Sequence, residues 1–126
     1  MEPSIPCSEL LDHLADEEIL VVDCRSEEQW HSQGTHIPGA LRVSPDELPD
    51  SIDALPEDEL IVLCDGSFDA AESRKACRLF RLCGREAVFL QGGFPAWLRG
   101  GFPTESHATR RIRPAAISSR SEQLSR

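Results

Sequence analysis

The sequence lacks several features that would assign it to common classes of protein. It has no run of 18 or more apolar residues that could span a bilayer, and its first ten residues, MEPSIPCSEL, have neither the basic nor the apolar stretch of a secretory signal. The cysteines are odd in number and form no CxxC pair, which argues against a disulfide framework and against a zinc site; they are Cys7, Cys24, Cys64, Cys77 and Cys83. These absences predict a soluble cytoplasmic protein with reduced thiols, no membrane partner and no metal or other cofactor.

Positive charge is also scarce over most of the chain. Residues 1–106 carry 8 Lys or Arg against 21 Asp or Glu, whereas residues 107–126 carry 5 Arg against a single Glu. Nonspecific nucleic-acid binding depends on cations that neutralise phosphates, so the acidic body argues against a nucleic-acid partner. The change of charge predicts one domain over residues 1–106 and a basic, flexible tail over residues 107–126. The tail is either solvated or docked on the acidic body or on a partner.

The 126 residues suit one compact domain, and 40% of them are hydrophobic. Continuous apolar runs that are too short for helices predict buried strands in EILVVDCR (18–25), LIVLC (60–64) and AVFLQGG (87–93), and a brief strand in ALRV (40–43). Helical patterns follow Ser8, run through SEEQWHSQG to Gly34, and recur in FPAWLRGG. The clearest helix is AAESRKACRLFRLCG, which would place Ala76, Leu79, Phe80 and Cys83 on one face and end at Gly84.

Strands that alternate with helices at this short spacing predict an α/β fold with a mainly parallel sheet that is covered on both faces. Parallel sheets of this kind bind ligands at the carboxyl ends of their strands. Cys64 is the last residue of the LIVLC strand. The sequence therefore places Cys64 where a functional side chain would be expected.

Four segments in series resemble a single rhodanese-like domain: VVDCR, GTHIPGA, LIVLC with its loop and helix, and LQGGFPAWLRGGFPTE. The resemblance covers about residues 5 to 105. It implies a three-layer domain with about five sheet strands. In that family a cysteine at the end of the fourth strand carries sulfane sulfur as a persulfide, and Cys64 matches that position. The implied partners are a small sulfur donor, such as thiosulfate or a persulfide, and a thiol acceptor, which can be a protein.

The loop after Cys64 departs from the family pattern. The sulfurtransferase pattern has four residues between the cysteine and an arginine, then a serine; here Ser73 matches the serine, Glu72 replaces the arginine, and seven residues separate Cys64 from Glu72. The predicted substrate-binding loop comprises Asp65, Gly66, Ser67, Phe68, Asp69, Ala70, Ala71, Glu72, Ser73 and Arg74. Backbone amides at the start of the helix would stabilise a thiolate, whereas the carboxylates of Asp65, Asp69 and Glu72 would oppose it. We therefore expect slow turnover with thiosulfate.

Several other residues are candidates for the functional site, and each also has a simpler structural interpretation. Asp23 and Arg25 match the family's Asp-x-Arg pair and are interpreted as a structural brace near the site, and His36 as a hydrogen-bonding residue that fixes its loop. Cys24 is either a resolving thiol for Cys64 or a buried substitute for an aliphatic residue. Arg74 either binds an anion in place of the missing arginine or is solvated.

Two hypotheses for function remain. The first is a sulfurtransferase or persulfide carrier that uses Cys64 as its nucleophile. The second is a rhodanese-like interaction or regulatory module without turnover. The presence of Cys64 favours the first, and Glu72 in place of arginine weakens it.

Overall fold

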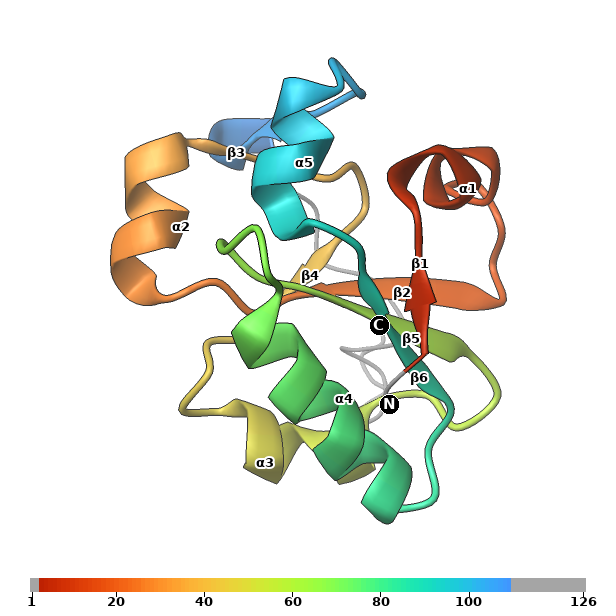
Figure 1. The fold of residues 1–126 in the computed structure, drawn as a ribbon. Coiled ribbons are helices and arrows are strands. Elements are labelled where there is room, and N and C mark those ends of the chain that lie inside the picture. Colours follow the sequence, from red (N-terminus) through yellow and green to blue (C-terminus); the bar gives the residue numbers. More distant parts are fainter. Residues whose placement is uncertain (1–2, 110–126) are drawn as a thin grey trace, which may run out of the picture.

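The computed structural model describes residues 3–109 and contains a parallel sheet of five strands in the order β1-β6-β5-β2-β4 (Figure 1). Every hydrogen-bonded pair in this sheet is parallel. The strands are β1 (Ser4–Ile5), β2 (Ile19–Asp23), β4 (Leu41–Arg42), β5 (Leu60–Cys64) and β6 (Ala87–Leu90). The predicted α/β class and the predicted strand number are confirmed.

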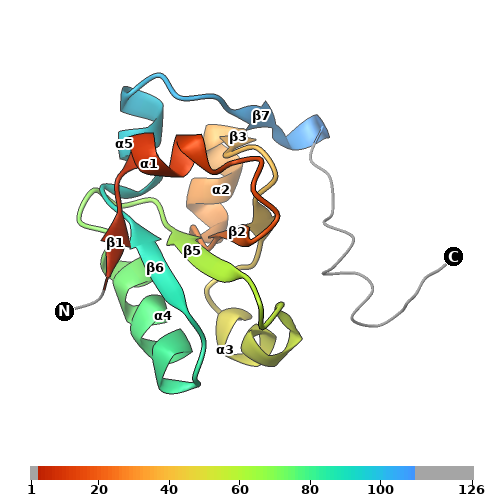
Figure 2. The same cartoon turned by 90° about the vertical axis from the view of Figure 1, so that its right-hand side faces the viewer.

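Helices cover both faces of the sheet, which gives the predicted three layers (Figures 1 and 2). On one side lie α1 (Cys7–Asp12), α2 (Glu27–Gln33) and α5 (Gly93–Arg99). On the other lie α3 (Leu48–Ser51), the short 3-10 helix η1 (Ile52–Ala54) and α4 (Ala71–Leu82). None of the helices within residues 3–109 has the length and apolar character needed to span a membrane.

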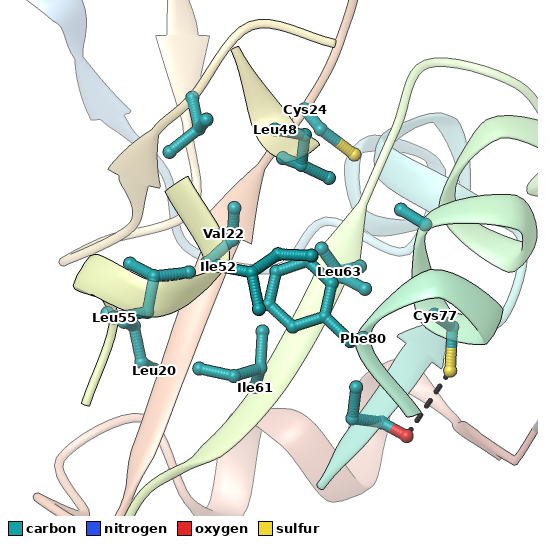
Figure 3. Close-up of a cluster of buried hydrophobic side chains, with 13 residues drawn as sticks. Leu20, Val22, Cys24, Leu48, Ile52, Leu55, Ile61, Leu63, Cys77 and Phe80 are labelled. Carbon is teal, nitrogen blue, oxygen red and sulfur yellow. Dashed lines mark hydrogen bonds between the residues drawn. The ribbon is translucent and has the colours of Figure 1, made fainter. Parts of the chain in front are cut away.

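The sheet separates two apolar cores because consecutive side chains of a strand point to opposite faces. The core beneath α3 and α4 is built around Leu20, Val22, Leu63 and Phe80 (Figure 3). The core beneath α1 and α5 holds Val21, Val62 and Cys64 together with Leu10 and Trp97 from the helices. Strands β2 and β5 contribute to both cores, which explains their continuous apolar runs.

Local signals set the helix ends where the sequence offers a cap. Ser26 and Gln29 form a reciprocal capping box at the start of α2, and Gly34 ends it at φ 68°, a conformation that glycine adopts without a steric penalty. Two predicted details are wrong. Helix α1 starts at Cys7 after Pro6 instead of after Ser8, and Cys83 lies exposed beyond the end of α4 instead of on its buried face.

A second, two-stranded antiparallel sheet was not predicted from the sequence. It pairs β3 (Thr35–His36) with β7 (Glu105–Ser106), and the 3-10 helix η2 (His107–Thr109) follows directly. The His107 ring stacks on Trp30 with 3.7 Å between ring centroids. His107 therefore belongs to the folded body, and the predicted boundary at residue 106 is too early. The predicted flexibility of residues 110–126 concerns a segment outside the described residues.

Two histidines share a hydrogen bond that joins this small sheet to α2. His36 Nδ1 lies 2.8 Å from His107 Nδ1, His36 Nε2 lies 3.1 Å from Glu105 Oε1, and His107 Nε2 lies 2.8 Å from the Trp30 carbonyl. Burial lowers the pKa of His36, and the neighbouring His107 charge lowers it further, against the opposing hydrogen bond from Glu105.

This arrangement predicts that the protein loses stability in mild acid. Below about pH 6.5 the unfolded chain takes up a proton at His36, whereas the folded protein resists this proton because the pKa of His36 is lowered, so the free energy of unfolding falls as pH falls, by up to ~1.4 kcal/mol per pH unit. Urea unfolding at pH 7, 6 and 5 measures the slope. His36→Asn should flatten it, and His31→Asn, at an exposed position, should not. Equal slopes for wild type and His36→Asn would contradict the prediction.

Candidate active-site loop

The candidate site lies at the carboxyl edge of the sheet, where β2 and β5 end side by side. Asp23 is paired with Cys64 in the register of the two strands, and the Cys24 amide donates to the Cys64 carbonyl at 2.8 Å. Cys64 is the last residue of β5, as predicted, and residues 65–70 connect it to α4. The loop rises between α2 and α5 (Figure 1).

The Cys64 thiol points into the protein core. Its residue has 0% exposed surface, and it packs in the cluster that contains Ile37, Phe94 and Trp97. The only polar contact of Sγ recorded within residues 3–109 is a weak one of 3.8 Å to the Asp65 carbonyl. A donor molecule cannot reach this sulfur unless the chain around it opens.

The surroundings also favour the neutral thiol. Burial is the largest cause that raises the pKa of Cys64 well above its ordinary value, followed by the charge of Asp23 and the neighbouring Cys24; Arg25 acts in the opposite direction, and Asp65 adds to the rise. Sulfur exchange requires a thiolate, so the closed conformation disfavours the reactive form. From the sequence, the carboxylates of Asp65, Asp69 and Glu72 were expected to oppose the Cys64 thiolate. Burial and Asp23 outrank Asp65, and the side chains of Asp69 and Glu72 are exposed.

The Asp65 carboxylate accepts hydrogen bonds from the backbone amides that were expected to hold an anionic donor. Its residue is 2% exposed, and its two carboxylate oxygens accept from the Ser73 amide at 2.8 Å and the Ser67 amide at 3.2 Å. The Ser67 hydroxyl donates to the same carboxylate at 3.3 Å. The first turn of α4 therefore has an internal anion bound at its positive end.

Other residues of the predicted loop make hydrogen bonds within the loop or ion pairs on α4. The Ala71 amide donates to the Ser67 hydroxyl at 3.3 Å and to the Asp69 carboxylate at 3.1 Å. Glu72 pairs with Lys75 on the exposed face of α4, and Arg74 is exposed on the same helix. Ala70 adopts a left-handed conformation at φ 55°, which is unfavourable for a residue with a side chain. The loop is a closed turn that is held by its own serine and aspartates.

Cys24 does not face Cys64. The Cys24 side chain lies in the core beneath α3 and α4 (Figure 3), while the Cys64 side chain lies in the core on the opposite side of the sheet. This placement contradicts the expected approach of the two thiols to disulfide range, because the register puts Asp23, not Cys24, beside Cys64. Cys24 packs with Leu48 and Val22, which fits its alternative interpretation as a buried substitute for an aliphatic residue.

Asp23 and Arg25 form a buried ion pair beside the loop. Arg25 Nη2 and Nε donate to Asp23 at 2.8 and 3.0 Å, and Nη2 also donates to the Thr35 carbonyl at 2.8 Å. The guanidinium lies 3.9 Å from the Phe94 ring centroid. This geometry suits a brace between β2, β3 and α5.

His36, which the sequence predicted as a third supporting residue, lies in the histidine pair described above. No group of three or more His, Cys, Asp or Glu residues within residues 3–109 could hold a metal ion.

The start of α5 supports the loop, and the sequence analysis did not identify this contact. The Phe94 amide donates to the Asp65 carbonyl at 2.8 Å. Gly92 and Gly93 both have positive φ, 76° and 61°. A Cβ at Gly93 would lie 2.4 Å from the Ser67 carbonyl and 2.9 Å from the Asp65 carbonyl. The consecutive glycines in LQGGF were the available signal for this close approach of two backbones.

Gly93→Ala should therefore destabilise the protein by about 3 kcal/mol or more, because it combines an unfavourable φ with a clash against backbone atoms. The matched control is Gly101→Ala, where φ is 72° and no atom lies within 4 Å of the added Cβ. This control should lose only about 1 kcal/mol, from the backbone alone. Urea unfolding of both variants measures the difference. Equal losses would show that α5 does not press on the loop.

Comparison with known proteins identifies the family. The family model described as rhodanese-like domain matches residues 7–99. The curated HTH-type transcriptional regulator Rv0324 of Mycobacterium tuberculosis is 32% identical over 108 residues, which are 85% of this chain and 46% of that protein. This chain thus spans about half the length of the curated relative that it matches.

Solved structures share the fold. A thiosulfate sulfurtransferase from Pseudomonas aeruginosa is 28% identical with a TM-score of 0.71, over 91% of this chain and 23% of that chain. A full-length protein from Lactobacillus plantarum is 22% identical with a TM-score of 0.75, over 82% of this chain and 87% of that one. The family match covers most of the chain, and the parallel sheet with helices on both faces agrees with it. The chain belongs to the rhodanese-like domain family.

Proposed function

We propose that this rhodanese-like domain is a binding and regulatory module that does not turn over sulfur through Cys64 in its closed form. The observation that carries the proposal is the Asp65 carboxylate, which accepts from the Ser67 amide of the loop and from the Ser73 amide in the first turn of α4. A sulfurtransferase of this family needs that cradle free for an anionic donor. Here the cradle binds a side chain of its own loop.

The state of Cys64 supports the same conclusion. Its sulfur has no exposed surface and its pKa is raised, chiefly by burial, so both access and ionisation oppose attack on a donor. Glu72, at the position where the family pattern has arginine, is exposed and paired with Lys75, so this position offers no cation to the loop. A dianion such as thiosulfate therefore lacks the cation that the family pattern offers at this position.

A regulatory role fits the relative that is named a transcriptional regulator, since that protein matches this chain over 85% of the chain's length. The partner proposed here is a protein or small molecule that binds at the carboxyl edge of the sheet. We place the protein in the cytoplasm, because its cysteines are free thiols.

Sulfur transfer through Cys64 is the second candidate. It is favoured by the position of Cys64 at the carboxyl end of the fourth strand of the main sheet and by the 28% identity with the Pseudomonas aeruginosa thiosulfate sulfurtransferase. This function requires residues 65–70 to open and release the Asp65 carboxylate. The accepting thiol would then approach from the same opening.

The two candidates make opposite predictions for the reduced protein in thiosulfate or polysulfide. Under the binding proposal, intact-mass and peptide analysis should find no added sulfur atom on the Cys64 peptide. Iodoacetamide should modify Cys64 at a rate within about tenfold of Cys77, because both residues are 0% exposed in the apolar cores. Cys83 is exposed and should react first. Persulfide on Cys64, or alkylation of Cys64 far faster than Cys77, would refute the proposal and support sulfur transfer.

A further prediction tests whether Asp65 keeps the loop closed. Asp65→Asn keeps the shape of the side chain, but its NH₂ group cannot accept a hydrogen bond. Either the Ser67 or the Ser73 amide therefore loses its acceptor, at a cost of about 1–3 kcal/mol. Local opening should then speed the alkylation of Cys64 by about tenfold or more, while Cys77, on the far side of the sheet, keeps its rate. Unfolding curves identify any loss of global stability. An unchanged Cys64 rate would mean that Asp65 does not hold the loop.

A further inference from the structure

We propose that the cavity between α2, α5 and the loop tip at Gly66 and Phe68 binds a small organic anion, with its oxyanion directed to Arg25 and its apolar body against Phe68 and Phe94. The inference rests on the binding function proposed above and names its ligand class. It involves no sulfur chemistry, so its test is independent of the state of Cys64.

The cavity has a volume of about 270 Å³ and lies beside the closed loop. A water molecule occupies about 30 Å³ of liquid, so an inorganic ion alone would leave most of this space unfilled. Ten residues line the cavity; the argument uses Arg25, Gln29, Phe68, Phe94, Leu98 and Arg99. Neither Cys24 nor Cys64 is among the ten, which separates this cavity from the thiol chemistry of the family.

An unpartnered buried cation points to the ligand. Arg25 is 1% exposed, and its Nε and Nη2 atoms are used by Asp23 and Thr35. Its Nη1 atom is the sole buried side-chain nitrogen or oxygen atom without a hydrogen-bond partner in the described part of the chain. A buried donor without an acceptor is unfavourable, and an N–H of a guanidinium is satisfied best by an anionic oxygen. Arg25 is one of the residues that line the cavity, so a ligand bound there would lie next to this guanidinium.

The charge of the lining is the reverse of the charge of the protein. The whole chain carries 22 acidic against 13 basic residues, yet the lining contains Arg25 and Arg99 and no Asp or Glu. Asp23 neutralises one of the two arginines. Gln29 uses its carbonyl oxygen for the Ser26 amide, which leaves its side-chain NH₂ group as a further donor type at the same wall. The net positive lining selects an anion over a cation or a neutral molecule.

Aromatic and aliphatic side chains form the remaining wall. Phe68 is 55% exposed and Leu98 is 38% exposed, and both line the cavity, so they offer apolar surface to a ligand. The Arg99 guanidinium lies 4.7 Å from the Phe68 ring centroid, so a second cation sits directly over the apolar surface. An apolar group joined to a carboxylate would contact Phe68 and Phe94 while its oxygens reach the arginines. This combination defines the ligand class as an organic anion with a flat or compact apolar body.

Benzoate is a suitable probe of this chemistry. Titration of ¹⁵N-labelled protein should produce saturable shifts at the amides of residues 66–68 and 93–99 and at the Arg25 Nε–H, with a dissociation constant on the order of 1–10 mM for so small a molecule. Benzamide, which is neutral, and inorganic phosphate, which has no apolar body, should each bind at least fivefold more weakly. Absence of saturable shifts, or equal binding of benzamide, would overturn the proposal.

Two exposed arginines provide a matched pair of variants. Arg99 and Arg81 each lie in the last turn of a helix, α5 and α4, and only Arg99 lines the cavity. Arg99→Gln should weaken benzoate at least fivefold, whereas Arg81→Gln should change its affinity by less than twofold. Phe68→Ala should weaken benzoate and leave phosphate unaffected. Equal losses in Arg99→Gln and Arg81→Gln would mean that general charge attracts the anion, and would overturn the site.

Discussion

The buried pair of Asp23 and Arg25 is the interaction on which the carboxyl edge of the sheet depends. It joins the end of β2 to the Thr35 carbonyl through a hydrogen bond and to α5 through the stacking of Arg25 on Phe94. Removing two charges from water is unfavourable, and this loss is offset only when geometry and hydrogen bonding are good. Here two arginine nitrogens bind one carboxylate in a forked arrangement, which meets that condition.

The same pair influences both proposed features of the domain. Asp23 lies beside Cys64 in the strand register, and its negative charge adds to burial in raising the pKa of that thiol. Arg25, which partly opposes this effect, leaves one nitrogen without a partner beside the cavity under α5. The ion pair of Asp23 and Arg25, which stabilises the fold, thus makes Cys64 less reactive and places a cationic side chain at the wall of the cavity.

The loop after β5 shows how a change of length alters a site without changing the fold. The resemblance supplied the position of Cys64, and the count of residues to Glu72 showed that the loop was unusual. The count could not show that Asp65 turns inward to the Ser73 amide while Asp69 and Glu72 stay exposed. All three are acidic residues in one loop, and only the backbone path determines which one reaches the start of α4.

The sequence by itself determined the α/β class, the strands around Val21 and Val62, the helix that ends at Gly34, and Cys64 as the end of a strand. These features depend on local signals, namely periodicity, capping residues and the family motifs, which a chain carries without its tertiary contacts. Only the tertiary structure decided that Cys24 and Cys64 face opposite cores, that His107 joins Trp30, and that Arg25 meets Phe94. Each of these facts depends on strand register or on contacts between distant segments. Register and packing are set by the whole fold, because shifting a strand by one residue turns every side chain to the other face.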